Sequence, residues 1–268
     1  MGKKLQIVFW LIIAIIAFIL LGGVIYNLAR ATYEDPIHPE VTFEIANLGT
    51  IKMELYQEYA PNTVANFIKL VERGYYDTDK VLYGKDDLNL YFGVTAEGEI
   101  EIPQASLLNK EIEVDSEEDF QYSIPGEFAA NGFNQNTLCH EKGVVTLMRE
   151  SYGSALLEEG YNSGVSQIGI VMKDTAASLN GVYAAFGRIT EGLDLLEEIY
   201  NNAEIAAPEV NEETGEPIET GVEAFATKYV VSTSKVDTHG IDFGYPQIVE
   251  RFNYDEYVYQ MFNSQYGN

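Results

Sequence analysis

The longest apolar run in the chain lies near its N-terminus. Residues 7–26 are almost all hydrophobic, and none of them is charged. Twenty helical residues extend about 30 Å, the thickness of the hydrocarbon core of a bilayer. Lys3 and Lys4 precede this run, whereas only Arg30 follows it closely. This pattern predicts one transmembrane helix with a cytoplasmic N-terminus, which would place the remaining residues on the outer side of the cell membrane.

A cleaved signal peptide is the alternative interpretation of this region. Ala29-Arg30-Ala31 matches the small-residue pattern of a cleavage site. The apolar core of a signal peptide, however, usually has about 7–15 residues, and this run is longer. We therefore expect an uncleaved anchor over residues 1–31, followed by a short linker over residues 32–40 that contains two prolines.

The clearest alternation of apolar and polar positions lies in residues 49–77. Ile51, Met53 and Leu55 alternate with polar neighbours, as in a half-buried strand. A helical apolar face follows, with residues at i, i+3, i+4 and i+7: Val64, Phe67, Ile68 and Val71. Pro61 suits the first turn of this helix, and Gly74 suits the left-handed position after its last turn. The pattern predicts a strand, a turn and an amphipathic helix.

The rest of the chain reads mainly as strands. Strands are expected over residues 41–45, within 80–91, after Gly143, before Val171 and over 227–236. A second helix is expected where Leu193, Leu196 and Ile199 form an apolar face. Residues 100–119 are acidic and predict an exposed loop, and residues 206–221 predict another.

Several of these segments resemble the cyclophilin-type peptidyl-prolyl isomerases. The chain has Ala60-Pro61-Asn62-Thr63-Val64-Ala65-Asn66-Phe67, then Gly74-Tyr75-Tyr76-Asp77, and later His140, Gly143, Ser166-Gln167 and Phe186-Gly187 in the expected surroundings. The resemblance implies a mainly β fold, a closed eight-stranded antiparallel barrel with two capping helices. It covers residues 41–236 and leaves 237–268 as an aromatic and acidic C-terminal extension.

The charge of the chain restricts its partners. The formal net charge is -26, and residues 31–268 hold 13 basic and 42 acidic residues. Such a surface repels phosphate backbones, so we expect no nucleic-acid partner. The resemblance implies proline-containing polypeptides instead, with the N-terminal helix attached to a membrane. Solubility alone is the simpler interpretation of the charge.

The resemblance implies isomerisation of the peptide bond before proline. Resonance gives this bond a barrier of about 18–20 kcal/mol, and a donor aimed at its nitrogen stabilises the twisted state. In the family this donor is an arginine in a Phe-His-Arg segment. Here Val81, Leu82 and Tyr83 stand at those positions, so the arginine is missing.

Three residues are candidates to replace this arginine: Lys85, Arg149 and Tyr83. The resemblance also implies a substrate groove, whose expected residues are Gln167, Met148, Leu179, Tyr183, Leu90 and Phe92. Gly169 replaces the phenylalanine that forms the floor of the proline pocket in the family. We expect either an isomerase of exported polypeptides with a degenerate site, or an inactive polypeptide-binding module that acts as a holdase or scaffold. In a third interpretation, Lys85 and Arg149 are ordinary surface charges.

No cofactor and no metal site is expected. His38, His140 and His239 match no zinc spacing and are interpreted as structural or surface residues, and Cys139 is the single cysteine. The aromatic residues of the C-terminal extension, Phe252, Tyr254, Tyr257, Tyr259 and Phe262, either pack on the barrel or dock a partner. A purely structural anchor that works through this extension is the remaining interpretation.

Overall fold

The computed structural model describes residues 2–31, 36–77, 79–174, 176–208, 210–211, 214, 216–218 and 221–266. By its internal contacts the chain divides into two units, residues 1–37 and residues 38–268. The boundary lies inside the expected linker, of which residues 32–35 are outside the described part.

The described residues of the first unit form one long helix, α1 (Lys3–Ala31). Within the described part of the chain, no helix combines the length and the apolar character needed to cross a membrane. The transmembrane helix expected over residues 7–26 is therefore not borne out, although a helix does form there.

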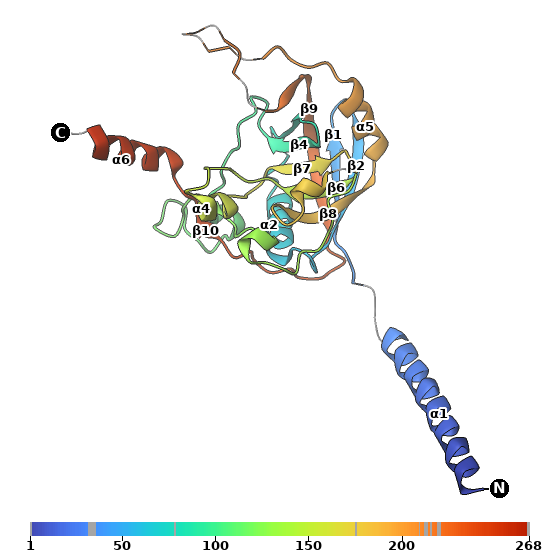
Figure 1. Ribbon diagram of the computed structural model, residues 1–268. Helices are drawn as coiled ribbons and strands as arrows, with labels where there is room; N and C mark the ends of the chain where they lie inside the picture. The colour runs from blue at the N-terminus through green and yellow to red at the C-terminus, as the bar shows by residue number, and fades with distance from the viewer. Residues whose placement is uncertain are drawn as a thin grey trace. The chain divides into compact units, whose positions relative to one another are not determined.

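The second unit is built on a closed antiparallel barrel (Figure 1). Its strands are ordered β1-β2-β8-β6-β7-β4-β3-β9, and β9 pairs with β1 to close it. Their bounds are β1 Glu40–Ile45, β2 Gly49–Leu55, β3 Val81–Lys85, β4 Asn89–Val94, β6 Val144–Leu147, β7 Ile168–Val171, β8 Ala184–Glu191 and β9 Glu223–Asp237. The eight-stranded antiparallel barrel expected from the resemblance is confirmed.

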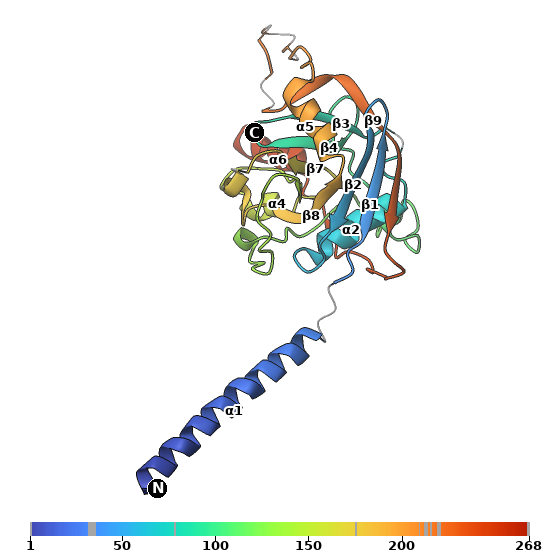
Figure 2. The same cartoon turned by 90° about the vertical axis from the view of Figure 1, so that its right-hand side faces the viewer.

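Two helices cover opposite ends of this barrel, as both views show (Figures 1 and 2). In α2 (Pro61–Glu72) the apolar residues at helical spacing are all buried, and Gly74 has a left-handed φ of 69° just after the helix. In α5 (Leu193–Asn202), Leu196 and Ile199 are buried. The predicted helices and their apolar faces are thus confirmed.

Short elements connect the barrel strands. They are α3 Ala105–Leu108, β5 Tyr122–Ser123, the 3-10 turn Ala129–Asn131, α4 Leu157–Tyr161 and the 3-10 turn Ala176–Leu179. The acidic residues of the expected loop are exposed from Glu111 to Glu118, whereas Ala105 and Leu108 are buried against the core. The loop prediction therefore holds for the acidic part and misses a short helix before it.

The C-terminal extension crosses the surface of the barrel unit. Its β10 (Val249–Glu250) pairs with β5, and α6 (Tyr254–Tyr266) follows. Three of its aromatic residues pack in one group with Tyr152: Phe252, Tyr254 and Tyr257. Tyr259 and Phe262 are more than 60% exposed. Packing is therefore the role of the first part of the extension.

Candidate functional site

A polar row crosses the outer face of the barrel at strands β4, β7 and β6. Tyr91 pairs with Gly169, and Gly169 pairs with Thr146. Their neighbours along each strand point inward and belong to the core, which fits the period of two of a strand. Gly169 therefore stands at the centre of a row that faces away from the barrel core, and it is itself buried, as is Thr146.

Two of the predicted substrate-binding residues lie on the other face. Leu90 and Phe92 are 0% and 2% exposed and belong to the barrel core. Phe92 contacts the ring of Phe43 at a centroid distance of 4.8 Å. The prediction that they contact the substrate does not hold in this structure, because the intervening Tyr91 takes the outward position.

Gln167, Met148 and Arg149 are brought together in one small pocket. Gln167 is half-buried, and its side-chain amide makes no hydrogen bond to any residue that the structure describes. An amide offers both a donor and an acceptor. The pocket therefore contains an amide donor and acceptor that no described residue occupies, and substrate binding by Gln167 stays a prediction.

Hydrogen bonds from neighbouring residues hold the backbone around Gln167 in place. The hydroxyl of Tyr76 donates to the carbonyl of Ser166 at 2.7 Å, and the hydroxyls of Tyr75 and Ser166 are 3.0 Å apart. Met148 N–H donates to the carbonyl of Gln167 at 2.9 Å. These contacts fix the position of the residue that carries the free amide.

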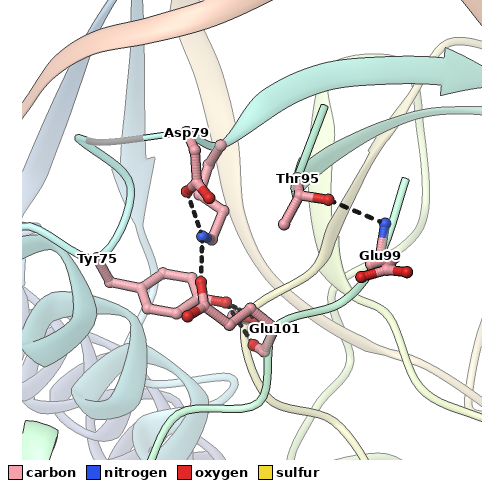
Figure 3. A network of polar contacts seen from close by, with 7 residues as sticks. Tyr75, Asp79, Thr95, Glu99 and Glu101 are labelled. Atoms are coloured by element: carbon pink, nitrogen blue, oxygen red, sulfur yellow. Dashed lines mark hydrogen bonds and ion pairs between the residues drawn. The ribbon is translucent and has the colours of Figure 1, made fainter. Parts of the chain in front are cut away.

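A buried lysine, Lys80, fixes the loop next to this region, and Figure 3 labels its neighbours Tyr75, Asp79 and Glu101. Lys80 Nζ lies 2.5 Å from Asp79 and 2.6 Å from Glu101, and 4.7 Å from the centre of the Tyr75 ring. Burial lowers the pKa of Lys80, but the hydrogen bonds to Asp79 and Glu101 outweigh it, so the net shift is upward. Tyr75 donates to the carbonyl of Glu101 at 2.6 Å. A charged lysine thus ties the loop to the tyrosine that supports Ser166.

Arg149 is held in place by aromatic rings. Its guanidinium lies 4.7 Å from the centre of Tyr183, 4.9 Å from Tyr161 and 5.4 Å from Phe128. It donates through Nε to the carbonyl of Val182 and through Nη1 to that of Glu150, both at 3.0 Å. Within the described residues, Nη2 has no partner. Arg149 is therefore not an ordinary surface charge: it anchors the turn that carries Tyr183 and retains one donor group.

The other two candidates for the missing arginine lie elsewhere. Lys85 donates to the carbonyl of Tyr200 at the end of α5 at 2.8 Å and lies 3.9 Å from Glu223. Tyr83 sits where the pairing of β3 shifts, and its ring packs beside Gly98 and under Lys228. Neither residue lines the pocket of Gln167. Their predicted catalytic role has no geometric support.

Leu179 and Tyr183 flank the polar row. Leu179 packs on a small apolar cluster made of Val144, Val171, Ala176 and Ala185. Tyr183 is covered by the Arg149 guanidinium. Their turn is linked to the row by His140, which contacts Asn180 Oδ1 through Nδ1 at 2.9 Å and Thr146 Oγ1 through Nε2 at 3.1 Å. Both predicted residues thus border the site without entering the pocket of Gln167.

His140 gives a pH-dependent prediction. Burial lowers its pKa, and the hydrogen bond to Asn180 opposes this in part. A lowered folded pKa means that the unfolded state binds more protons, so stability is present above about pH 6.5 and declines as pH falls. Urea unfolding of wild type between pH 7.5 and 5.5 should show this decline, at most about 1.4 kcal/mol per pH unit for one proton. His140→Gln should show a smaller decline, and an equal one would contradict the prediction.

The glycine at position 169 is covered by a methionine. A Cβ built on Gly169 would lie 2.8 Å from Met148 Sδ and 3.3 Å from Thr146 Cγ2. The resemblance places a phenylalanine ring at this position, and here the flexible Met148 side chain fills that space. The apolar surface next to Gln167 is therefore supplied by Met148, a side chain that adapts to different shapes.

Arg251 completes the same pocket from the C-terminal extension. Its Nη1 donates to the carbonyl of Ser163 at 3.1 Å, and its Nη2 lies 3.5 Å from Glu150 Oε1. The sequence prediction missed this residue because it lies beyond the region of resemblance. One signal was available: Arg251 is the single basic residue, histidine aside, among residues 237–268.

Comparisons with known proteins agree with this architecture. Residues 40–220 match the family model described as "Cyclophilin type peptidyl-prolyl cis-trans isomerase/CLD". The chain is 28% identical over 168 residues to peptidyl-prolyl cis-trans isomerase B of Bacillus subtilis (strain 168), which covers 59% of this chain and 89% of that protein. It is 25% identical over 161 residues to peptidyl-prolyl cis-trans isomerase-like 1 of Rhizopus delemar, covering 57% and 75%.

Two similar solved structures come from Cryptosporidium parvum. A crystal structure of a cyclophilin-type peptidyl-prolyl cis-trans isomerase aligns with a TM-score of 0.48 and 16% identity, over 75% of this chain and 99% of that chain. The crystal structure of that protein in the presence of the dipeptide Ala-Pro aligns with a TM-score of 0.43 and 18% identity, over 71% and 98%.

Proposed function

This chain belongs to the cyclophilin-type peptidyl-prolyl cis-trans isomerase family, and we propose that it binds extended proline-containing polypeptides beside Gln167 and accelerates rotation about the bond before proline. The observation that carries this proposal is the half-buried Gln167 amide, which has no partner among the described residues and lies in a pocket that Met148, Arg149 and Arg251 also line. A bound polypeptide is hereafter called the client.

The pocket offers the groups that this reaction needs. The Gln167 amide would hold a backbone carbonyl of the client, and Met148 would contact the proline ring. Arg149 is the candidate donor for the proline nitrogen as that nitrogen becomes pyramidal, since its Nη2 has no partner among the described residues. A donor that binds the twisted bond more strongly than the planar one lowers the barrier.

A binding module without catalysis is the second candidate function. Two expectations from the resemblance favour it: Tyr83 would stand at the position of the family's arginine, and Met148 would cover the position of the proline-pocket phenylalanine. In this case the chain would hold extended polypeptides as a holdase or scaffold, and Gln167 would serve binding alone.

NMR exchange spectroscopy on short X-Pro peptides separates the two functions. The full chain at catalytic concentration should increase the cis-trans exchange rate of at least one peptide. Without a catalyst this exchange takes about tens of seconds or longer. If the folded chain binds the peptides without faster exchange, the enzyme proposal is rejected and the binding module remains.

The clients and the location are a further part of the proposal. The positive residues before the uncharged run at 7–26 suggest that the barrel unit works on exported polypeptides outside the cell membrane. Cell fractionation followed by protease treatment of intact cells should find the barrel unit in the membrane fraction and accessible; recovery in the soluble fraction would contradict this.

A further inference from the structure

The pocket beside Gln167 has a local charge opposite to that of the chain. Among its lining residues, Arg149 and Arg251 are basic and Glu150 is the one acid, whereas the chain as a whole carries -26. We propose that this pocket binds an acidic side chain of the client, close to its proline. The inference rests on the proposed function and adds a preference for the client sequence.

Arg251 is positioned from both sides. On its N-terminal side, Val249 and Glu250 pair with Ser123 and Tyr122, and Arg251 N–H donates to the carbonyl of Gln121 at 2.9 Å. On its C-terminal side, aromatic rings hold the chain, because Tyr254 stacks on Tyr152 at 4.9 Å. The guanidinium therefore reaches the pocket on a fixed backbone, which reduces the entropic cost of binding a ligand.

The two guanidinium groups keep donors for a ligand. A guanidinium has five N–H donors, and each of these two makes two hydrogen bonds within the described part of the chain. Glu150 lies at the 3.5 Å limit of a hydrogen bond to Arg251, and its side chain is 39% exposed. One weakly placed carboxylate does not neutralise two arginines, so a second carboxylate is favourable here.

The positive charge of Arg251 lies at a largely buried site. The Arg251 side chain is 16% exposed, and Ser163 and Val165 in the wall of the pocket are 4% and 3% exposed. Screening by water is weaker at such a site than on the open surface. The enclosed space of the pocket is about 10 Å³, room for roughly one water molecule, so the client carboxylate would lie at its mouth, held by guanidinium donors that match its geometry.

The test compares peptides that differ in one side chain. Each peptide carries Glu, Gln or Lys at one of the three positions before a single proline, and its Kd for the full chain is measured by isothermal titration calorimetry. At about 0.15 M salt the long-range repulsion from the acidic surface is largely screened. We expect the Glu peptide to bind roughly fivefold more tightly than the Gln peptide at one position, as for a partly exposed charge-assisted hydrogen bond.

Variants assign this preference to the pocket. Arg251→Met keeps an apolar stem and should remove most of the preference, whereas Arg251→Lys should keep part of it. Arg188→Met is the matched control, because it removes an arginine on β8 that contacts Glu141 and Lys142 outside this pocket. It should leave the ratio of Glu to Gln affinities unchanged. Glu150→Gln should increase that ratio, and it provides a second test if Arg251→Met fails to fold.

The outcomes separate this inference from the proposed function. A Glu preference that depends on Arg251, without faster exchange of any X-Pro peptide, supports the inference and rejects the enzyme. Faster exchange with equal affinity for Glu and Gln peptides at all three positions rejects the inference and keeps the enzyme. A preference that survives Arg251→Met, or the absence of binding by every peptide, also overturns the inference.

Discussion

Replacing Glu127 with alanine should lower the free energy of unfolding by about 2 kcal/mol. Glu127 is 5% exposed, and its carboxylate accepts hydrogen bonds from Asn62 N–H at 2.9 Å and from Thr63 N–H and Oγ1 at 2.7 Å. These amides belong to the first turn of α2, where no intrahelical acceptor exists. Burial raises the pKa of Glu127, and the hydrogen bonds from Asn62 and Thr63 oppose this shift. Because burial disfavours the charged carboxylate, the expected loss of unfolding free energy is smaller than the sum of three hydrogen bonds.

Urea denaturation of the full chain measures this effect, with Glu72→Ala as the matched control. Glu72 is in the same helix, but its ion pair with Lys69 at 2.8 Å is at the surface. Exposed pairs of this kind contribute about 0.3–0.5 kcal/mol. Equal losses in the two variants would mean that Glu127 does not hold the start of α2.

Replacing Gln167 with alanine should lower kcat/KM for X-Pro isomerisation about tenfold. The loss corresponds to one hydrogen bond to the client, about 1.4 kcal/mol. The melting temperature should change little, because the Gln167 side chain bonds to none of the described residues and its backbone remains held by Met148.

Exchange spectroscopy gives the rate, and thermal unfolding gives the stability. Gln135→Ala is the control, since Gln135 is exposed and lies outside the pocket. A Gln167 variant that lost stability and activity together would point to a structural role for the amide. A variant with unchanged kcat/KM would remove Gln167 from the site.

Local patterns were enough to predict the strand and helix of residues 49–77, whereas the closed barrel was expected from the family resemblance. The alternation of Ile51, Met53 and Leu55 and the helical face of α2 each require burial on one side, and the structure buries those residues. Pro61 and Gly74 mark the ends of the helix because proline lacks a donor and glycine accepts a positive φ. These rules act within a few residues, so a sequence displays them directly.

The site depended on features that a sequence does not display. A shift in the pairing of β3 at Tyr83 changes which side chains face outward, and an alignment carries no record of it. Leu90 and Phe92 were expected to line the substrate groove. Alternate residues of β4 face opposite sides of the sheet, and these two face the core. Arg149 and Arg251 acquire their surroundings through contacts with residues far away in the sequence. Long-range contacts of this kind explain why Arg251 was missed.

The most direct test of the central claim is the cis-trans exchange rate of an X-Pro peptide in the presence of the full chain. The account predicts that wild type accelerates exchange, that Gln135→Ala does so equally, and that Gln167→Ala does so about tenfold less. Exchange at the uncatalysed rate with folded wild-type protein, for every peptide that binds, would contradict it.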